Sequence, residues 1–167
     1  MEKKNIISIC VRSLSTSAEA DWVTPVEALE FMELQKEKYG SEEFIIIDSN
    51  APFKISEYDS VSELVEISEQ LENLTDDEIE VLEAVFEHHT NDFDEALEIV
   101  EDGNYMIYDD CCSMTEVAER YLDETGMLNE LPDFAVRYFD FEAYGRDMEI
   151  EGYFYQLNYN TYLEIFR

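Results

Sequence analysis

Positively charged residues are scarce in this sequence. Its 167 residues include 10 Lys and Arg against 42 Asp and Glu, which gives a formal net charge of −32. Such a charge repels nucleic acids and anionic membranes, so both are excluded as partners. It also disfavours the compact state through self-repulsion, so we expect the charge to serve a function. The surface that fits it best is a basic one.

Features of several common protein classes are missing as well. No run approaches the roughly 18 apolar residues of a membrane-spanning helix, and the short apolar stretch 6–11 is unlike a signal peptide. The odd set of Cys10, Cys111 and Cys112 suits reduced thiols better than a disulfide framework. The expected location is therefore cytoplasmic, without membrane contact.

Residues typical of catalytic sites are few. Histidine occurs only as the adjacent pair His88 and His89, whose side chains would diverge by about 100° on a helix and so would not easily share a metal. Five Gly leave no glycine-rich phosphate loop, and no stretch has the order of an EF-hand. Close carboxylate pairs are inevitable among 42 acids, so they carry no glycosidase signal. We expect no catalytic residue, cofactor or metal.

The residues that are present predict a folded protein with an uneven distribution of charge. Apolar residues make up 46%, with 11 Tyr and 10 Phe, unlike a disordered acidic tail. The 65 residues from 55 to 119 hold 22 acids and no Lys or Arg. We therefore expect an α+β protein of three small domains: an α/β domain over 1–58, an acidic helical domain over 59–103, and an α/β domain over 104–167.

Local patterns predict the elements of the first domain. β-Branched residues predict strands at 5–12 and 44–47, with a third at 53–55. Thr24 and Glu27 form a capping box that opens a helix to about residue 38.

Three short helices are predicted in the middle domain. They begin at capping residues Ser60, Thr75 and Asn91, and the third ends at 102–104. The last domain is predicted to begin with a strand at 105–108 and a helix at 113–126. A helical stretch at 132–148, broken near Gly145, and a terminal hairpin of 153–157 with 161–166 are predicted to follow.

Acidic residues recur at helical spacing through the cation-free span. At about 1.5 Å per residue, such carboxylates repeat every ~4.5–6 Å along a helix, while DNA carries a phosphate every ~3.4 Å on each strand. Several such helices together would approach the charge density of DNA. The acids expected to contact a partner in this way are Glu63, Glu66, Glu69, Glu72, Asp76, Glu80, Glu83, Glu87, Asp94, Glu98, Glu101, Asp109, Asp110, Glu116, Glu119 and Asp123.

Two simpler explanations compete with a binding surface. A solvated helix face would mix Glu with Lys at i,i+4, and three successive helices lack any such cation. A surface adapted to high salt would spread its acids evenly along the chain, which this sequence does not. An acidic binding surface remains the preferred interpretation.

Several segments of the sequence resemble a known protein family, and this resemblance indicates a partner. The segment Tyr138–Met148, which reads YFDFEAYGRDM, together with Tyr121–Gly126 and Leu131-Pro132, resembles the ArdA antirestriction proteins. Matches at Ile47-Asp48, Pro52-Phe53 and Glu57-Tyr58 extend the resemblance through most of the chain. It implies an elongated, dimeric, non-enzymatic mimic of DNA that occupies the DNA-binding cleft of type I restriction–modification enzymes. Such proteins are carried by mobile genetic elements.

A homodimer and an alternative function complete the expectations. Subunits of charge −32 would not dock through their acidic faces, so the contact is expected at an aromatic group in the last domain, formed by Tyr138, Phe139, Phe141 and Tyr144. The alternative function is an acidic adaptor or chaperone for a basic DNA-binding protein.

Overall fold

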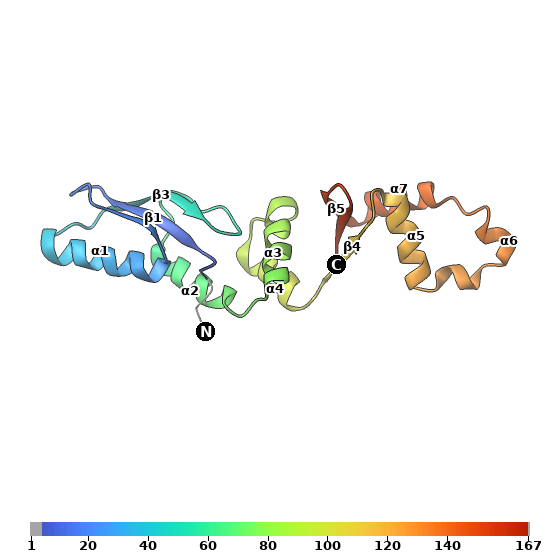
Figure 1. Ribbon diagram of the computed structural model, residues 1–167, viewed down its shortest axis with the longest axis horizontal. Helices are drawn as coiled ribbons and strands as arrows, with labels where there is room; N and C mark the ends of the chain where they lie inside the picture. Colours follow the sequence, from blue (N-terminus) through green and yellow to red (C-terminus); the bar gives the residue numbers. More distant parts are fainter. Residues whose placement is uncertain (1–4, 167) are drawn as a thin grey trace. The chain divides into compact units, whose positions relative to one another are not determined.

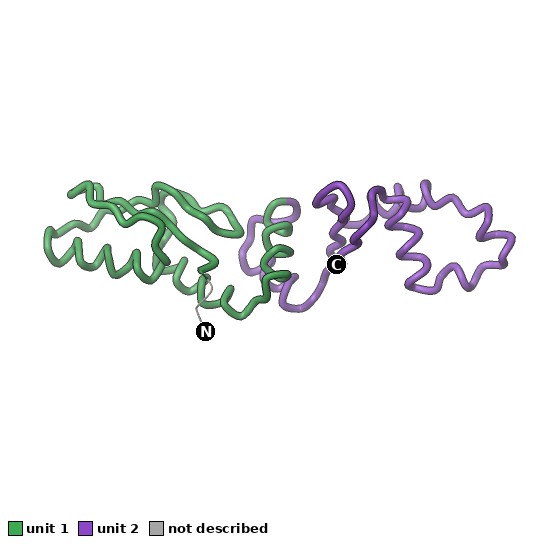
Figure 2. Tube along the Cα trace, in the orientation of Figure 1, with its two compact units in different colours: residues 1–87 green, residues 88–167 purple. Residues whose placement is uncertain are grey.

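Two compact units make up the chain. The computed structural model describes residues 5–166, and the units comprise residues 1–87 and 88–167 (Figures 1 and 2). Each unit contains helices and one three-stranded antiparallel sheet, which confirms the α+β class. The elongated three-domain arrangement and its boundaries stay a prediction.

The sheet of the first unit has the strand order β2-β1-β3. Strands β1 (Ser8–Ser13) and β3 (Phe44–Asn50) confirm two predictions. Strand β2 (Glu19–Val23) was not predicted; it is short, and all of its residues are exposed or half-buried. The strand expected at 53–55 is wrong. Residues 53–55 form a bend and irregular chain, and the Ile46 amide of β3 donates to the carbonyl of Glu57, beyond the predicted strand.

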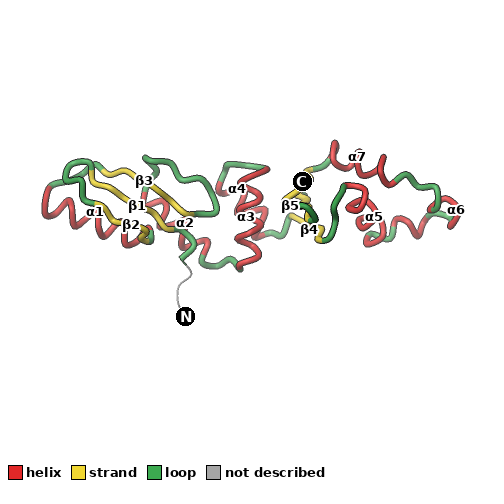
Figure 3. The backbone as a smooth tube through the Cα atoms, turned by 45° about the horizontal axis from the view of Figure 1, so that its top comes forward, coloured by secondary structure: helices red, strands yellow, loops and turns green. Residues whose placement is uncertain are grey.

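Helix α1 lies along one face of this sheet (Figures 1 and 3). It runs Pro25–Tyr39, and the predicted capping box of Thr24 and Glu27 is present at its start. Gly40 ends it at φ 66°, a left-handed conformation that glycine adopts without a Cβ penalty. Helix α2 (Val61–Leu71) packs against α1. The apolar residues of these elements form the core of the unit.

The three acidic helices are confirmed as α2, α3 (Asp76–His88) and α4 (Phe93–Glu101). At the start of α3, Thr75 and Glu78 form the expected reciprocal capping box. The cap of α4 is corrected by one residue. Asp92, not Asn91, accepts the Glu95 amide at 3.0 Å, because its carboxylate stands three residues before that donor.

The sheet of the second unit has the order β4-β6-β5. The predicted hairpin is present as β5 (Tyr153–Asn158) and β6 (Thr161–Ile165). Strand β4 (Tyr105–Asp109), expected from its sequence, pairs with the other edge of β6. The pairing places Tyr108 opposite Tyr162, and both side chains are buried.

The helical stretch after β4 breaks at a different point from the one expected. Helix α5 (Met114–Glu124) is followed by a 3-10 turn, η1 (Met127–Glu130), and the short helix α6 (Asp133–Val136). Helix α7 (Phe141–Glu151) then runs without interruption through Gly145. The break lies at 137–140, where Asp140 caps α7 by accepting the Ala143 amide at 2.9 Å. The predicted break at Gly145 is therefore wrong.

Gly145 serves helix packing instead. Helices α5 and α7 pack side by side, and Gly145 is buried where they meet. A Cβ at this position would lie 2.4 Å from the Met114 carbonyl oxygen at the start of α5. Only a residue without a side chain allows the two backbones to approach this closely.

Candidate partner-binding surface

All sixteen acids expected to contact a partner are exposed in the structure. They come from α2 and its end, α3, α4, the end of β4 and α5. These residues are Glu63, Glu66, Glu69, Glu72, Asp76, Glu80, Glu83, Glu87, Asp94, Glu98, Glu101, Asp109, Asp110, Glu116, Glu119 and Asp123.

The helical spacing of the acids explains their exposure. In α3, residues 81, 82, 84 and 85 are buried, and Glu80, Glu83 and Glu87 occupy the opposite face. In α4, residues 96, 97, 99 and 100 are buried in the same way. Each helix thus places an apolar stripe toward protein and its carboxylates toward solvent.

Further exposed acids on the same helices were not among the predicted residues. Asp77 on α3, Glu95 on α4 and Asp102 at its end are also exposed. They fall outside the regular spacing on which the prediction depended, and exposure is visible only in the folded chain. Half-buried Glu78 adds a further charge, because the backbone and then the side-chain hydrogen bond from Thr75 lower its pKa.

Some acids have local polar contacts that leave the charge in place. The Cys112 amide donates to the Glu116 carboxylate at 2.6 Å. The Asn160 side-chain amide donates to Asp110 at 3.3 Å. Neither donor is a cation, so neither contact offsets the charge of the acidic surface.

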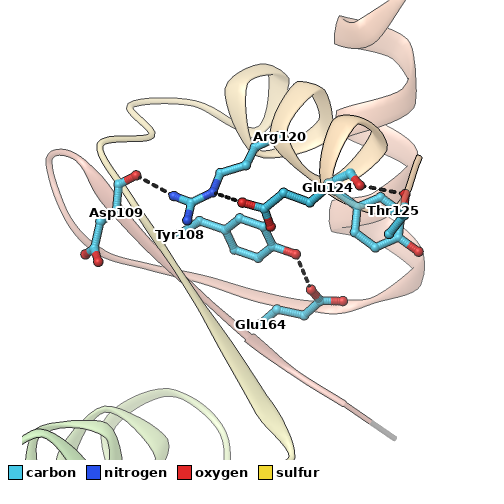
Figure 4. Close-up of polar contacts among 7 residues, drawn as sticks. Tyr108, Asp109, Arg120, Glu124, Thr125 and Glu164 are labelled. Carbon is cyan, nitrogen blue, oxygen red and sulfur yellow. Dashed lines mark hydrogen bonds and ion pairs between the residues drawn. The ribbon is translucent and has the colours of Figure 1, made fainter. Parts of the chain in front are cut away.

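Arg120, the first cation after the acidic span, is held within the second unit. Its Nε lies 2.8 Å from Glu124, and its Nη1 donates to the Asp109 carbonyl at 2.9 Å (Figure 4). The guanidinium also lies over the Tyr108 ring, 5.8 Å from its centroid. Because Arg120 pairs with Glu124, it leaves the predicted acids Glu116 and Glu119 of the same helix available to a partner.

Tyr108 and Glu164 join this network beneath Arg120. The Tyr108 hydroxyl donates to the Glu164 carboxylate at 2.7 Å (Figure 4). Burial raises the pKa of Tyr108, and the bond to Glu164 raises it further. Burial also raises the pKa of Glu164. The raised pKa keeps the Tyr108 hydroxyl protonated and able to donate near neutral pH, and we assign the pair to the structure of the unit.

The four aromatic residues expected at a dimer contact divide into two kinds. The Phe139 ring lies 4.9 Å from the Phe141 ring and 5.7 Å from the Tyr144 ring, centroid to centroid, so these three pack within one subunit. Tyr138 is 86% exposed, and nearby Phe134 is 70% exposed. Only Tyr138 of the predicted four is thus fully available to a second subunit.

The comparison with protein families identifies the chain. The model of the family described as Antirestriction protein (ArdA) matches residues 17–162, nearly the whole chain. The chain belongs to the ArdA antirestriction family. This confirms the resemblance found in the sequence and implies an antirestriction function. A search of curated proteins finds no match.

The ArdA-like segments have a structural role in the second unit. Residues 121–126 end α5, and residues 138–148 lead into α7 and include Gly145 at its contact with α5.

Within residues 5–166, no helix is long and apolar enough to cross a membrane. The same part of the chain contains no cluster of three or more His, Cys, Asp or Glu able to hold a metal ion.

Proposed function

We propose that this ArdA protein inhibits type I restriction–modification enzymes by occupying their DNA-binding cleft in place of duplex DNA. The observation that carries the proposal is the exposure of every predicted acid in a 65-residue span without Lys or Arg. A cleft that binds DNA presents Lys and Arg to phosphates, and a dense set of carboxylates satisfies the same cations. Such inhibition would protect incoming DNA, in keeping with the family.

Competition with DNA tests the proposal. The protein and duplex DNA are expected to bind a type I enzyme mutually exclusively, and affinity is expected to fall about 100-fold between ~50 and ~200 mM salt, because screening weakens each charge contact. Fluorescence anisotropy of labelled duplex, displaced by the protein at each salt concentration, measures both effects.

A second experiment controls for nonspecific attraction between opposite charges. A basic protein that does not bind DNA should show no comparable binding at ~150 mM salt, where the Debye length is about 8 Å. Simultaneous binding of the protein and duplex DNA to the enzyme would contradict occupation of the cleft. An affinity that does not change with salt would contradict the electrostatic mechanism.

We also infer a homodimer that forms through the second unit. Exposed apolar side chains are concentrated between η1 and the start of α7, where Leu131 and Met127 accompany Phe134 and Tyr138 at exposures of 37%, 47%, 70% and 86%. An exposed apolar group of this kind is typical of a protein interface. Placing it at the subunit contact would leave the acidic helices of both subunits open to the enzyme.

Substitution of the exposed aromatics tests the dimer. The double variant Phe134→Asp/Tyr138→Asp is expected to shift the protein from dimer to monomer at micromolar concentration, since two buried anchors would each become a desolvated charge. Sedimentation velocity gives the mass. Tyr159→Asp, at an equally exposed residue (82%) between β5 and β6, is the control and should stay dimeric. A wild-type monomer at that concentration would refute the inference.

A further inference from the structure

A cavity of about 280 Å³ opens in the second unit beside α4. It lies between α4, the loop that follows this helix, the start of β5 and the end of β6. Ligand pockets commonly measure ~300–1,000 Å³, so this one suits a single side chain better than a larger molecule. All of its lining residues belong to the one unit.

The polar lining of the cavity is negative. Glu95 and Glu98 both contribute to it, and both are exposed. Their spacing of three residues places them on one face of α4, where the two carboxylates are neighbours. Two neighbouring carboxylates attract a cation.

Aromatic rings form another part of the wall. Tyr153 and Phe166 line the cavity together with His89. The His89 ring meets the Tyr153 ring edge-on, with centroids 4.9 Å apart. His89 Nδ1 and the Tyr155 hydroxyl lie 2.9 Å apart, which fixes the His89 ring in place. The Phe166 amide donates to the Asn104 carbonyl at 2.9 Å and holds the strand end against the loop. The cavity is thus formed before any ligand binds.

We propose that this cavity binds the guanidinium group of one arginine from the partner protein, an inference that rests on the proposed function. Two carboxylates and flanking aromatic rings match a guanidinium, which is planar, donates up to five hydrogen bonds and stacks on rings. Lysine fits less well, because its ammonium is more strongly hydrated and does not stack in this way. Arginines of DNA-binding proteins enter narrow, strongly negative minor grooves, and the cavity offers them a similar setting.

A capped arginine tests the cavity without the enzyme. The probe is N-acetylarginine methylamide, titrated into isotope-labelled protein, with N-acetyllysine methylamide as the comparison. We expect saturable NMR shifts at Tyr153, Asn104 and Phe166, with half-saturation at least about threefold lower for arginine than for lysine.

Matched pairs of substitutions on the same helix separate the cavity from general charge. Glu95→Gln/Glu98→Gln removes two charges from the cavity, and Asp94→Asn/Glu101→Gln removes two exposed charges elsewhere on α4. The first pair is expected to raise the half-saturation concentration about fivefold and the second less than about twofold, since a charge-assisted contact exceeds the effect of a screened surface charge. In addition, Tyr153→Leu should weaken arginine binding and exposed Tyr159→Leu should not.

The outcomes distinguish the cavity from the function. Shifts spread evenly over the acidic surface, or equal weakening by the two pairs, would overturn the arginine site even where the protein still displaces DNA from the enzyme. Saturable, arginine-selective shifts that only the first pair weakens support the site. If the wild-type protein showed those shifts and yet failed to compete with DNA, the proposed function would fail and the arginine site would stand.

Discussion

Replacing Gly145 by alanine is expected to lower the free energy of unfolding by about 2–3 kcal/mol, through overpacking of a close helix contact. The added Cβ would lie 2.4 Å from the Met114 carbonyl oxygen and 2.7 Å from its carbon. Both are backbone atoms, so no side-chain rotation relieves the contact. Helices α5 and α7 would have to move apart, and the buried side chains around Met114 and Val117 would lose contacts.

The sign of the effect decides what this glycine does. In an ordinary exposed helix, Gly→Ala stabilises by about 1 kcal/mol because alanine is the better helix former. A close backbone approach predicts the opposite sign. Chemical denaturation followed by circular dichroism measures the change, with loss of Tyr fluorescence as a second probe of the second unit. A stabilised Gly145→Ala variant would show that the α5–α7 contact is looser than the structure has it.

Gly103→Ala is the control for backbone conformation. Gly103 has φ +65°, and nothing lies within 4 Å of a Cβ built there. Its substitution should therefore cost only the left-handed penalty of about 1–2 kcal/mol. We expect the Gly145 variant to lose more stability than this control and to lose α5–α7 protection in hydrogen exchange.

Capping residues predicted most of the helices, because the start of a helix is determined by a few neighbouring residues. The pairs Thr24 with Glu27 and Thr75 with Glu78 both form reciprocal capping boxes in the structure. A cap satisfies donors of its own first turn, so its effect does not depend on the rest of the chain. Where two capping residues stand side by side, as at Asn91 and Asp92, the sequence alone did not distinguish them.

Features that depend on distant residues were not predictable in this way. Strand β2 is short, has no buried residue and pairs with an edge of β1. The sequence predicts a helix break at Gly145, whereas the observed role of this glycine depends on its contact with Met114, 31 positions earlier. Both features depend on tertiary contacts, which override the local propensity of the sequence.

The candidate site likewise has a part that the sequence predicted and a part that it did not. Exposure of the acids on α2 to α5 followed from their spacing opposite apolar residues, which is a property of each helix alone. The cavity beside α4 was not foreseen, because it joins Glu95 and Glu98 to Tyr153, more than fifty residues away in the chain. A pattern of one helix contains no information about the strand that packs next to it.

Neutralising six carboxylates of the cation-free span is expected to weaken inhibition of a type I enzyme roughly 30- to 150-fold. Each exposed charge contact is worth about 0.3–0.5 kcal/mol, so six together lose about 2–3 kcal/mol. A single Glu→Gln change should alter inhibition by about twofold. The six acids to replace by Gln, all exposed and outside the α4 cavity, are Glu66, Glu69, Glu80, Glu83, Glu101 and Glu119.

A set of six exposed acids outside the span gives the matched control. Replacing them by Gln changes the net charge from −32 to −26, as in the test set. Inhibition by the control variant should fall less than about fivefold, since its lost charges act only at long range through a screened solvent. The control acids are Glu30, Glu33, Glu37, Glu43, Glu149 and Glu151.

Stability and binding should move in opposite directions in the test set. Removing six like charges relieves repulsion, so thermal denaturation should show a higher midpoint while DNA-cleavage assays show weaker inhibition. A mimic of phosphates spreads its binding energy over many similar contacts, whereas ordinary interfaces concentrate it in a few anchors. An adaptor with a defined docking site would lose all binding with one or two of the six changes and be indifferent to the others. Equal loss of inhibition in the test and control sets would mean that net charge alone, and not the exposed acids of α2 to α5, determines binding to the enzyme.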